Sequence, residues 1–533
     1  MRRVVLLAIS AKYVHSSLSV RVLAGGVKRY ARLPYDVRIV ECTINQSGDD
    51  IAKCVADFAP DVVGISTYIW NAGKLPDLLR SLRRTIPGAV FVLGGPEASY
   101  NADYWRRNGA DFVLCGEGEY SFPMFLDSLA EGEPPARTEF DPLRINEPID
   151  PYDDAYLDAL NGRIAYIETS RGCPFQCAFC LSGGSDVRFF PMESSKKQLL
   201  KLSKSGATTI KLVDRTFNCD AKRAYELFEY IIGLTTDCRF HFEVAADLFD
   251  ERTLSLLSLA PPGLIQFEAG VQSFFEPALK ASSRQTNLQR VEQNIKAILR
   301  GRNIHVHVDL IAGLPYETLP DFQDSFDRAY ALGAHTLQLG FLKLLHGSGL
   351  RDQAKDLGIR YCAEPPYEIQ SSPWLSAGDL RTLKQAENAL RHTYNKGRFL
   401  STLEYVLSVS GMRPFSLFLT IGRAAPNHGT DLAEYAESIY DICAELPGVD
   451  RHELRDKMIC DWLGMVMGKN TPNFLKREGR SRMPEIARRI LGRSIARGEA
   501  AVLSSGTGVF VDSLGRDRVT GLYRLHFVEL SHI

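Results

Sequence analysis

The chain has 533 residues, about three times the size of a typical domain, so we expect two to four domains. Its 45% hydrophobic and 24% charged residues are typical of a folded globular protein and exclude long-range disorder. The 63 basic and 64 acidic side chains leave a net charge of −1, which speaks against nucleic acid as a partner. No apolar run approaches the roughly 18 residues that span a bilayer, and the apolar start Val4–Ile9 is too short for a signal peptide. We therefore expect no membrane partner and a cytoplasmic location.

The first 135 residues alternate short apolar strands with amphipathic helices. The expected strands are Val4–Ile9, Val37–Val40, Val62–Ser66, Ala89–Leu93 and Phe112–Leu114, with helices near 18–31, 50–58, 74–85, 100–108 and 119–131. Fully apolar strands separated by helices indicate a parallel sheet covered on both faces. We expect an α/β, flavodoxin-like (Rossmann-type) domain over residues 1–135, with its ligand site at the carboxyl ends of the strands.

Polar residues and glycines follow four of these five strands. They are Ser10, Tyr13, His15 and Ser16 after the first strand; Ser66, Thr67, Tyr68, Trp70 and Asn71 after the third; Gly94, Gly95, Pro96 and Glu97 after the fourth; and Gly116, Glu117, Gly118 and Glu119 after the fifth. Each segment alone is also typical of a tight strand-to-helix turn. Four of them on one sheet edge indicate a ligand site, and paired glycines let a bulky ligand approach the backbone.

The remainder of the chain divides into a linker, a second run of strands and a mainly helical end. Residues 136–163 are rich in proline and acidic residues without a clear period, which is typical of a linker. Strands are expected at Ile164–Thr169, Thr208–Val213, Phe240–Ala245, Leu264–Gly270, His305–Ile311 and Thr336–Leu342. They predict a partial (β/α)6 barrel over residues 164–365, with active residues at its C-terminal rim. Residues 366–533 predict a mainly helical C-terminal domain that ends in a hairpin of Gly508–Val511 with Tyr523–Val528.

Three of the eleven cysteines, Cys173, Cys177 and Cys180, form a Cys-x3-Cys-x2-Cys array directly after the first barrel strand. In a chain without a secretion signal, an odd cysteine count favours metal or redox chemistry over a disulfide framework. Three thiolates this close can hold three irons of a four-iron cluster and leave the fourth iron open for catalysis. A zinc site completed by a distant ligand, or three incidental thiols, are the alternatives. The other eight cysteines are expected to be structural: Cys42, Cys54, Cys115, Cys219, Cys238, Cys362, Cys443 and Cys460.

The segment Ser170–Cys180 resembles the signature of the radical S-adenosylmethionine enzymes. The resemblance covers residues 160–350, because Phe240–Asp247, Phe267–Ser273 and Val308–Glu317 are similar to the family's third, fourth and fifth strand segments. It implies a [4Fe–4S] cluster and reductive cleavage of S-adenosylmethionine to methionine and a 5′-deoxyadenosyl radical. It also implies that S-adenosylmethionine contacts Phe179, Asp214, Glu243, Glu268, Gln272, Ala312, Gly313 and Leu314. The second strand departs from the family's Gly-Gly-Glu ending, which puts the role of Asp214 in question, and buried salt bridges are the alternative for Glu243 and Glu268.

A flavodoxin-like domain with Gly94–Ser99 and Gly116–Glu119 before such a barrel resembles the cobalamin-dependent subclass of this family. The resemblance covers about residues 1–130 and implies that cobalamin binds the strand-end residues given above. The segments Tyr68–Asn71 and Pro365–Tyr367 and the later Tyr394–Phe399 are similar to one uncharacterised branch of the subclass.

The sequence allows two interpretations of what lies at the lower face of the cobalamin. The chain departs from the family's Asp-x-His-x-x-Gly pattern, because Tyr13 and Leu18 stand at the Asp and Gly positions and no acidic residue is beside His15. The preferred interpretation is a cobalamin without a protein ligand, whose lower face is covered by Tyr68 and Trp70. His15 as an axial ligand is the alternative, and Trp70 could instead be a domain-interface core residue.

Several further residues are weaker candidates. His305, His307 and Asp309 alternate along one strand and share a face, which is either the barrel interior or a substrate-facing surface. His346 follows the sixth barrel strand, and Cys362 could approach the barrel rim.

These resemblances imply a C-methyltransferase that moves a methyl group from methylcobalamin to an unactivated carbon after hydrogen abstraction by the 5′-deoxyadenosyl radical. The substrate is a small molecule or a peptide, and the implied electron donor is a flavodoxin or ferredoxin. Two alternatives stay open: a rearrangement or ring-forming enzyme with the same cofactors but no methyl transfer, and a non-catalytic cobalamin or iron–sulfur sensor or carrier.

Overall fold

The computed structural model describes residues 2–133, 147–425, 431–465, 471–476, 483–493, 495 and 499–530. They form two compact units. Unit 1 contains Met1–Leu259, Lys280–Thr286 and Phe341–Pro373, and unit 2 contains Ala260–Leu279, Asn287–Gly340 and Trp374–Ile533. The predicted domain boundaries stay predictions, and residues 136–146 of the predicted linker lie outside the described residues.

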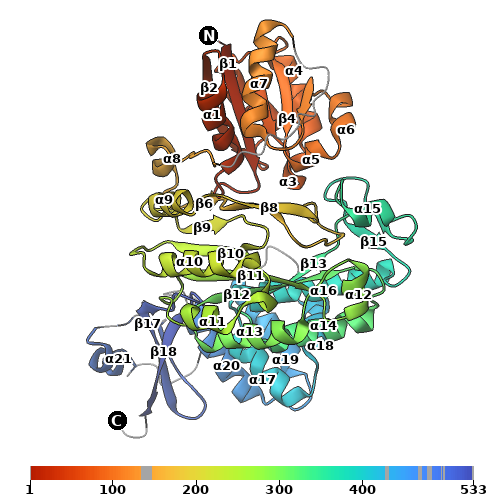
Figure 1. Cartoon of the computed structure of the whole chain (residues 1–533). Helices are drawn as coiled ribbons and strands as arrows, with labels where there is room; N and C mark the ends of the chain where they lie inside the picture. Colours follow the sequence, from red (N-terminus) through yellow and green to blue (C-terminus); the bar gives the residue numbers. More distant parts are fainter. Residues whose placement is uncertain are drawn as a thin grey trace. The chain divides into compact units, whose positions relative to one another are not determined.

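Unit 1 begins with a five-stranded sheet in the order β2-β1-β3-β4-β5 (Figure 1). Its strands are β1 (Arg2–Ser10), β2 (Tyr35–Thr43), β3 (Val62–Ser66), β4 (Val90–Gly94) and β5 (Phe112–Leu114). The strands pair in parallel throughout. This is the flavodoxin-like strand order, so the predicted fold class is confirmed.

Helices cover both faces of this sheet (Figure 1). Side chains of α1 (Leu18–Tyr30) and α7 (Gly118–Glu131) share one buried apolar cluster with Val4 and Leu6. Side chains of α2 (Gly48–Ala56) and α4 (Leu75–Thr85) share another with Val5 and Leu7. Successive strand side chains point to opposite faces, which is why one apolar strand supplies both clusters.

Short helices occupy the strand ends. They are α3 (Ile69–Ala72), α5 (Pro96–Ser99) and α6 (Ala102–Arg107). The helix predicted near 100–108 is present as α6, and the sequence did not predict the short helix α5 that precedes it.

Unit 1 continues with three parallel strands in the order β10-β9-β6. They are β6 (Ile164–Ile167), β9 (Thr209–Leu212) and β10 (Arg239–Val244). Between β6 and β9 lies an antiparallel hairpin of β7 (Ser170–Cys173) and β8 (Ser185–Phe189), which the sequence predicted as a loop. The prediction missed it because β7 gains its backbone hydrogen bonds only when residues 185–189 fold back onto it. The remaining elements of unit 1 are α8 (Asp154–Ala159), α9 (Met192–Leu202), α10 (Ala221–Ile232), α11 (Glu251–Leu257), α15 (Gly349–Gln353), β14 (Arg360–Tyr361) and β15 (Ile369–Ser371).

Unit 2 holds the other three predicted barrel strands in the order β13-β12-β11. They are β11 (Ile265–Gln272), β12 (His305–Ala312) and β13 (Thr336–Phe341), close to the predicted positions. Its helices are α12 (Glu276–Ala281), α13 (Leu288–Arg300), α14 (Leu319–Ala331), α16 (Ala377–His392), α17 (Leu400–Ser410), α18 (Pro414–Ala424), α19 (Leu432–Ala444), α20 (Arg451–Met465) and α21 (Met483–Leu491). The predicted C-terminal hairpin is present as β17 (Thr507–Arg516) and β18 (Tyr523–Glu529), and β16 (Ala500–Val502) extends it to three strands.

Over the described ranges, none of the helices combines the length and the apolar character that crossing a membrane requires.

Candidate active site

The loops after β3 and β4 are in direct backbone contact. The Thr67 amide donates to the carbonyl oxygen of Gly94 at 2.7 Å, and the Thr67 hydroxyl donates to the same oxygen. Gly95 has a φ of +102°, and a Cβ at this position would lie 2.5 Å from the Thr67 carbonyl oxygen. Only glycine fits here, so these two loops form a close-packed backbone surface at the carboxyl end of the sheet.

An aromatic pair stands beside this surface. The rings of Tyr68 and Trp70 are stacked, with centroids 4.2 Å apart and an interplanar angle of 7°. The Trp70 indole N–H donates to the Ile9 carbonyl at 3.1 Å, and the Asn71 amide donates to the same carbonyl at 3.2 Å. Trp70 is nevertheless 48% exposed, which differs from the buried core residue of the alternative interpretation. A large flat surface is therefore held in place while remaining accessible.

The loop after β1 pairs with the beginning of β6. His15 forms an isolated parallel bridge with Ile164, and its Nδ1 atom lies 2.6 Å from the Tyr166 hydroxyl oxygen. Ser16 is buried, and its hydroxyl lies 2.8 Å from the Ile164 carbonyl oxygen, to which it donates. Burial, reinforced by Lys12, Lys211 and Arg163, lowers the pKa of His15. Tyr13 is 76% exposed beside these contacts.

Arg171 joins the loop after β5 to the cysteine hairpin. One of its guanidinium nitrogens donates to Glu117 at 2.7 Å and to Glu119 at 2.5 Å, and the other donates to Glu168 at 2.8 Å. Arg188, the cross-strand neighbour of Arg171, pairs with the second Glu117 oxygen. The Arg171 and Glu119 side chains are only 18% and 7% exposed. The structure thus engages two of the three predicted cobalamin-binding glutamates, Glu117 and Glu119, in ion pairs with Arg171, two residues before the first cysteine of the array.

The three cysteines lie in and directly after β7, two of them buried. Cys173 and Cys177 are 8% and 6% exposed, and Cys180 is half-buried. Each sulfur has a polar neighbour: the Thr216 hydroxyl is 3.5 Å from Cys173 Sγ, the Arg284 guanidinium is 3.6 Å from Cys177 Sγ, and the Ser182 amide is 3.4 Å from Cys180 Sγ. The Arg284 and Ser182 N–H groups donate to sulfur and stabilise negative charge on it, as a metal-bound thiolate requires, whereas the Thr216 hydroxyl donates to the Arg215 carbonyl.

The chemistry of this donor set fits an iron–sulfur cluster. Within the described residues, no group of three or more His, Cys, Asp or Glu side chains converges on a single metal ion. The three cysteines of an open four-iron cluster bind three different irons, so they need not converge on one point. Three closely spaced thiols, two of them with N–H donors at their sulfurs, match that requirement.

The loop itself is fixed by close backbone contacts. Gly172 has a φ of +92°, and a Cβ there would lie 2.2 Å from the Asp186 carbonyl oxygen of the facing strand. The Ala178 amide donates to the Ser282 carbonyl at 2.9 Å. Phe179 is half-buried in the same loop.

Asp214 is fully engaged at the junction between β6 and β7. It is 1% exposed, and it accepts hydrogen bonds from the Thr169 amide at 3.0 Å, the Thr169 hydroxyl at 2.7 Å and the Ser170 hydroxyl at 2.5 Å. Burial raises its pKa, against the opposing effect of these donors. Glu243, on β10, forms an ion pair with Lys211 on β9 at 3.4 Å, and both side chains are partly exposed.

The other predicted S-adenosylmethionine residues lie in unit 2. Glu268 and Gln272 share the half-buried face of β11, while Ala312 and Leu314 are fully buried on either side of Gly313, whose φ is +101°.

The polar residues of β12 lie on its half-buried face. In the register of the two strands, His307 stands opposite Glu268 on β11. His307 Nε2 lies 2.9 Å from Asp309 Oδ1, and the His305 ring stacks on His335 at 4.9 Å. The strand therefore presents the shared polar face that the sequence predicted.

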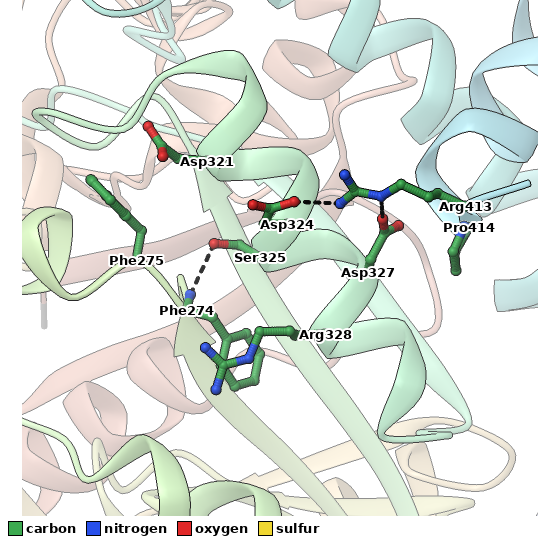
Figure 2. Close-up of a pocket in the computed structure, with 9 residues that line it drawn as sticks. All are labelled: Phe274, Phe275, Asp321, Asp324, Ser325, Asp327, Arg328, Arg413 and Pro414. Carbon is green, nitrogen blue, oxygen red and sulfur yellow. Dashed lines mark hydrogen bonds and ion pairs between the residues drawn. The ribbon is translucent and has the colours of Figure 1, made fainter.

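A cavity of about 570 Å³ lies elsewhere in unit 2, and none of the predicted site residues lines it. Its lining residues are Phe274, Phe275, Asp321, Asp324, Ser325, Asp327, Arg328, Arg413 and Pro414 (Figure 2). Figure 2 shows Arg413 reaching both Asp324 and Asp327, each at 2.5 Å. These charges are paired within the protein, and we assign no function to the cavity.

The remaining cysteines are all free thiols, and their surroundings differ. Cys42, Cys238 and Cys443 are buried, whereas Cys54 is exposed and Cys115 is half-buried. Cys219 is half-buried, and its pKa is raised by burial and then by its neighbour Cys173. Cys362 is half-buried, and its amide donates to the Glu368 carbonyl at 2.9 Å.

Sequence reasoning missed the residues that link these loops. Arg188, Arg284 and Tyr166 lie outside the recognised motifs, and Arg284 stands 107 positions from the cysteine it contacts. The sequence could have indicated a functional role only for Arg171, because this residue lies next to Gly172 and Cys173 in the cysteine segment.

Comparison with known families now gives the class of protein. Residues 4–126 match the B12 binding domain family, residues 167–329 match the radical SAM superfamily, and residues 355–501 match a family described as a protein of unknown function (DUF4080). The chain therefore joins a B12-binding domain to a radical S-adenosylmethionine domain, and the recognition made from its motifs is confirmed. Its sequence is similar to that of a cobalamin-dependent radical S-adenosylmethionine methyltransferase.

Two curated relatives and one solved structure illustrate this similarity. The cobalamin-dependent radical SAM methyltransferase TokK of Streptomyces tokunonensis is 22% identical over 73% of this chain and 62% of its own length. The uncharacterized methyltransferase PH0819 of Pyrococcus horikoshii is 25% identical over 54% of this chain and 68% of its own length. The structure of the radical S-adenosylmethionine methyltransferase TsrM from Kitasatospora setae matches with a TM-score of 0.57 and 18% identity, over 73% of this chain and 88% of that chain, which shows a shared fold. The chain spans about half to two thirds of the length of the curated relatives it matches.

Proposed function

We propose that this chain is a cobalamin-dependent radical S-adenosylmethionine enzyme that methylates an unactivated carbon. The observation that carries the proposal is Arg171, which holds Glu117 and Glu119 of the cobalamin-type loop against the strand that leads into the cysteine array. Enzymes that use two cofactors in one reaction need both bound close together and correctly oriented. The two homologous methyltransferases favour methyl transfer over other chemistry.

Cys173, Cys177 and Cys180 are the proposed ligands of a [4Fe–4S] cluster. When bound, the cluster and S-adenosylmethionine supply a 5′-deoxyadenosyl radical for hydrogen abstraction, and cobalamin supplies the methyl group. The N–H donors of Arg284 and Ser182 stabilise the charge of two of the thiolates.

The guanidinium of Arg284 is a proposed contact of S-adenosylmethionine. It lies against Cys177, and a guanidinium fork suits the carboxylate of an amino acid that chelates the neighbouring open iron. Glu243, Glu268, Gln272 and the Ala312–Leu314 backbone stay the proposed contacts for the rest of the molecule. Asp214 is proposed to position the β6–β7 junction instead, because both its oxygens already accept hydrogen bonds.

Cobalamin is proposed to bind over the loops after β1, β3, β4 and β5. The close contact between Thr67 and Gly95 leaves a surface without protruding side chains, and the exposed stack of Tyr68 and Trp70 offers a flat apolar cover for the lower face. His15 is proposed to act as a structural residue, because its backbone forms a parallel bridge with Ile164 and the stack of Tyr68 and Trp70 is the proposed cover of the lower face.

The proposed cofactors also indicate an electron donor, a class of substrate and a cellular location. A flavodoxin or ferredoxin is the proposed electron donor, and a small molecule or peptide is the proposed substrate. A reducing cytoplasm is the proposed location, because free cysteines and an iron–sulfur cluster persist there.

The test is product analysis with anaerobically reconstituted protein, reductant and S-adenosylmethionine carrying a labelled methyl group. We expect S-adenosylhomocysteine without substrate, up to the amount of bound cobalamin, and both 5′-deoxyadenosine and a labelled product when small-molecule or peptide fractions are added. If methionine and 5′-deoxyadenosine form without S-adenosylhomocysteine or labelled product, methylation is wrong and rearrangement or ring formation takes its place.

Cys177→Ala separates an enzyme from a carrier. It removes a cluster ligand, so we expect the loss of 5′-deoxyadenosine formation and of most of the bound iron. Cys443→Ala is the matched control, because Cys443 is a buried thiol within α19. A chain that bound cobalamin but formed neither product, with or without Cys177, would be a carrier or sensor.

A further inference from the structure

Residues 343–367, which follow β13, touch two of the cofactor loops in unit 1. We call this segment the strap. It meets residues 94–101, which contain the end of β4, the short helix α5 and the two residues after it, and which we call the β4–α5 loop. It also meets the cysteine loop, residues 173–181. The sequence predicted Glu97 as a cobalamin contact and His346 as a rim residue, and the structure places both in these contacts.

The first contact joins Glu97 to Tyr367. The Tyr367 hydroxyl donates to the Glu97 carboxyl group at 2.5 Å, and the two residues are 3% and 5% exposed. Burial raises the pKa of Glu97, although the bond from Tyr367 opposes that effect. The Arg351 guanidinium lies 4.8 Å from the centre of the Tyr367 ring and fixes the ring from the strap side. A buried polar pair of this kind costs free energy if either member loses its partner.

The second contact lies one turn further along the same loop. His346 Nε2 is 3.2 Å from the side-chain nitrogen of Asn101, and the His346 ring stands edge-on to Tyr367 at 5.0 Å. Burial and the nearby Arg351 lower the pKa of His346 to about 4, so the ring is neutral and can accept the bond from Asn101. A Cβ on Gly347 would lie 2.2 Å from the Tyr100 ring, so the strap and the loop are in close contact at this point.

The strap reaches the cysteine loop at its other side. The Leu350 amide donates to the Ala178 carbonyl at 2.8 Å, between Cys177 and Cys180. The Tyr100 hydroxyl donates to the Leu181 carbonyl at 3.4 Å, which ties the β4–α5 loop to the end of the cysteine loop directly. The β4–α5 loop, the cysteine loop and the strap are far apart in sequence, yet they contact one another at this point of the structure.

We propose that the strap is a positioning element that fixes the separation of the β4–α5 loop from the cysteine loop, with Tyr367 and Gly347 as its decisive contacts. The inference rests on the proposed function. Methyl transfer would break the methyl–sulfur bond of S-adenosylmethionine, the sulfur would keep the electron pair, and the methyl group would pass to a reduced cobalamin held at the β4–α5 loop, with S-adenosylhomocysteine as the leaving product. That step depends on the separation of the two loops. The one-electron cleavage to methionine and a 5′-deoxyadenosyl radical needs the cysteine loop and the contacts of S-adenosylmethionine but not the β4–α5 loop.

Two substitutions, Tyr367→Phe and Gly347→Ala, test the role of the strap by disturbing it in different ways. The first removes one hydroxyl, and the second inserts a methyl group against Tyr100. We compare the initial rate of S-adenosylhomocysteine formation, measured without substrate, with the rate of 5′-deoxyadenosine formation, measured with the small-molecule or peptide fractions. We expect the ratio of the first rate to the second to fall about 10- to 100-fold, the loss that a misplacement of ~1 Å causes. The iron content and the 5′-deoxyadenosine yield should stay at wild-type values. Tyr394→Phe is the matched control, because its buried hydroxyl bonds a carbonyl in unit 2.

Hydrogen–deuterium exchange supplies a readout that is independent of activity. In the protein without cofactors, both variants should speed exchange at residues 94–101 and 177–181, while β1 and β3 exchange as in the wild type. An unchanged product ratio, unchanged exchange at these loops, or an equal fall of both products would overturn the proposal. If the wild-type protein forms no S-adenosylhomocysteine, the proposed function fails, and exchange still decides whether the strap holds the two loops.

Discussion

The Nδ1 atom of His15 lies 2.6 Å from the hydroxyl oxygen of Tyr166, a residue 151 positions further along the chain. A histidine that ligates a metal usually has a polar group behind its second nitrogen, and the sequence offered none beside His15. The tertiary structure supplies one, so this contact makes the alternative of a cobalt-ligating His15 testable.

We expect His15→Gln to leave the electron paramagnetic resonance spectrum of bound cob(II)alamin unchanged, because the proposed cover of the lower face is the stack of Tyr68 and Trp70. Trp70→Ala should weaken cobalamin binding, because it removes the larger ring of that stack. Nitrogen hyperfine splitting that disappears in His15→Gln would show instead that the histidine is the axial ligand.

Arg171→Gln should lower the free energy of unfolding by about 2–3 kcal/mol, since it leaves the poorly exposed Glu119 without its cation. Arg489→Gln is the control, because its pair with Glu485 is largely exposed and exposed pairs contribute roughly 0–1 kcal/mol. Denaturant unfolding measures both. Equal effects of the two substitutions would contradict the role of Arg171 as a buried link.

Gly95→Ala should reduce cobalamin affinity at least 10-fold, because a Cβ at this left-handed position lies 2.5 Å from the Thr67 carbonyl oxygen and must displace a loop. Gly88→Ala is a suitable comparison, since a Cβ added at Gly88 would have no atom within 4 Å. Titration with cobalamin gives the two affinities. Normal binding by Gly95→Ala would place the cobalamin away from this surface.

Glu317 predicts a pH dependence of stability. It is fully buried, it accepts hydrogen bonds from Ser273 and Ser325, and burial raises its pKa from 4.5 to about 7. The folded chain therefore keeps a proton on Glu317 that the unfolded chain releases. The contribution of this proton to the free energy of unfolding is complete below pH 4.5 and is lost as the pH rises to about 7.

Between low and neutral pH, the wild-type protein should lose about 3 kcal/mol of its free energy of unfolding through Glu317, and the Glu317→Gln variant should not show this loss. Thermal unfolding of both proteins between pH 5 and pH 8 measures it, with the exposed Glu485→Gln as control. Parallel pH profiles of wild type and Glu317→Gln would show that the carboxyl group is ionised in the folded protein.

Asp214→Asn should lower the iron content of the reconstituted protein more than its affinity for S-adenosylmethionine. The new amide N–H groups would face the donors Thr169 and Ser170, which disturbs the junction that leads into Cys173. Iron analysis and a binding titration distinguish the two effects. Full iron content with weak binding would restore Asp214 as a direct contact of S-adenosylmethionine.

The strands and the strand-end loops were predictable because their signals are local. Apolar runs such as Val62–Ser66 bury both faces of a parallel strand, and a parallel sheet brings all carboxyl ends to one edge. The cysteine array was likewise readable from spacing alone. The hairpin of β7 and β8 was not, because its pairing joins residues on both sides of that array.

By itself the sequence determined the flavodoxin-like sheet, the βα strands of the second domain and the class of cofactor chemistry, since each depends on periodicity or on the spacing of neighbouring residues. Only the tertiary structure decided what the candidate side chains touch. Glu97 and Glu117 stand in glycine-rich turns that resemble ligand loops, yet their carboxyl groups are taken by Tyr367 and Arg171. Burial makes an unpaired polar group costly, and the partner that satisfies it can come from any distance along the chain, where no local pattern records it.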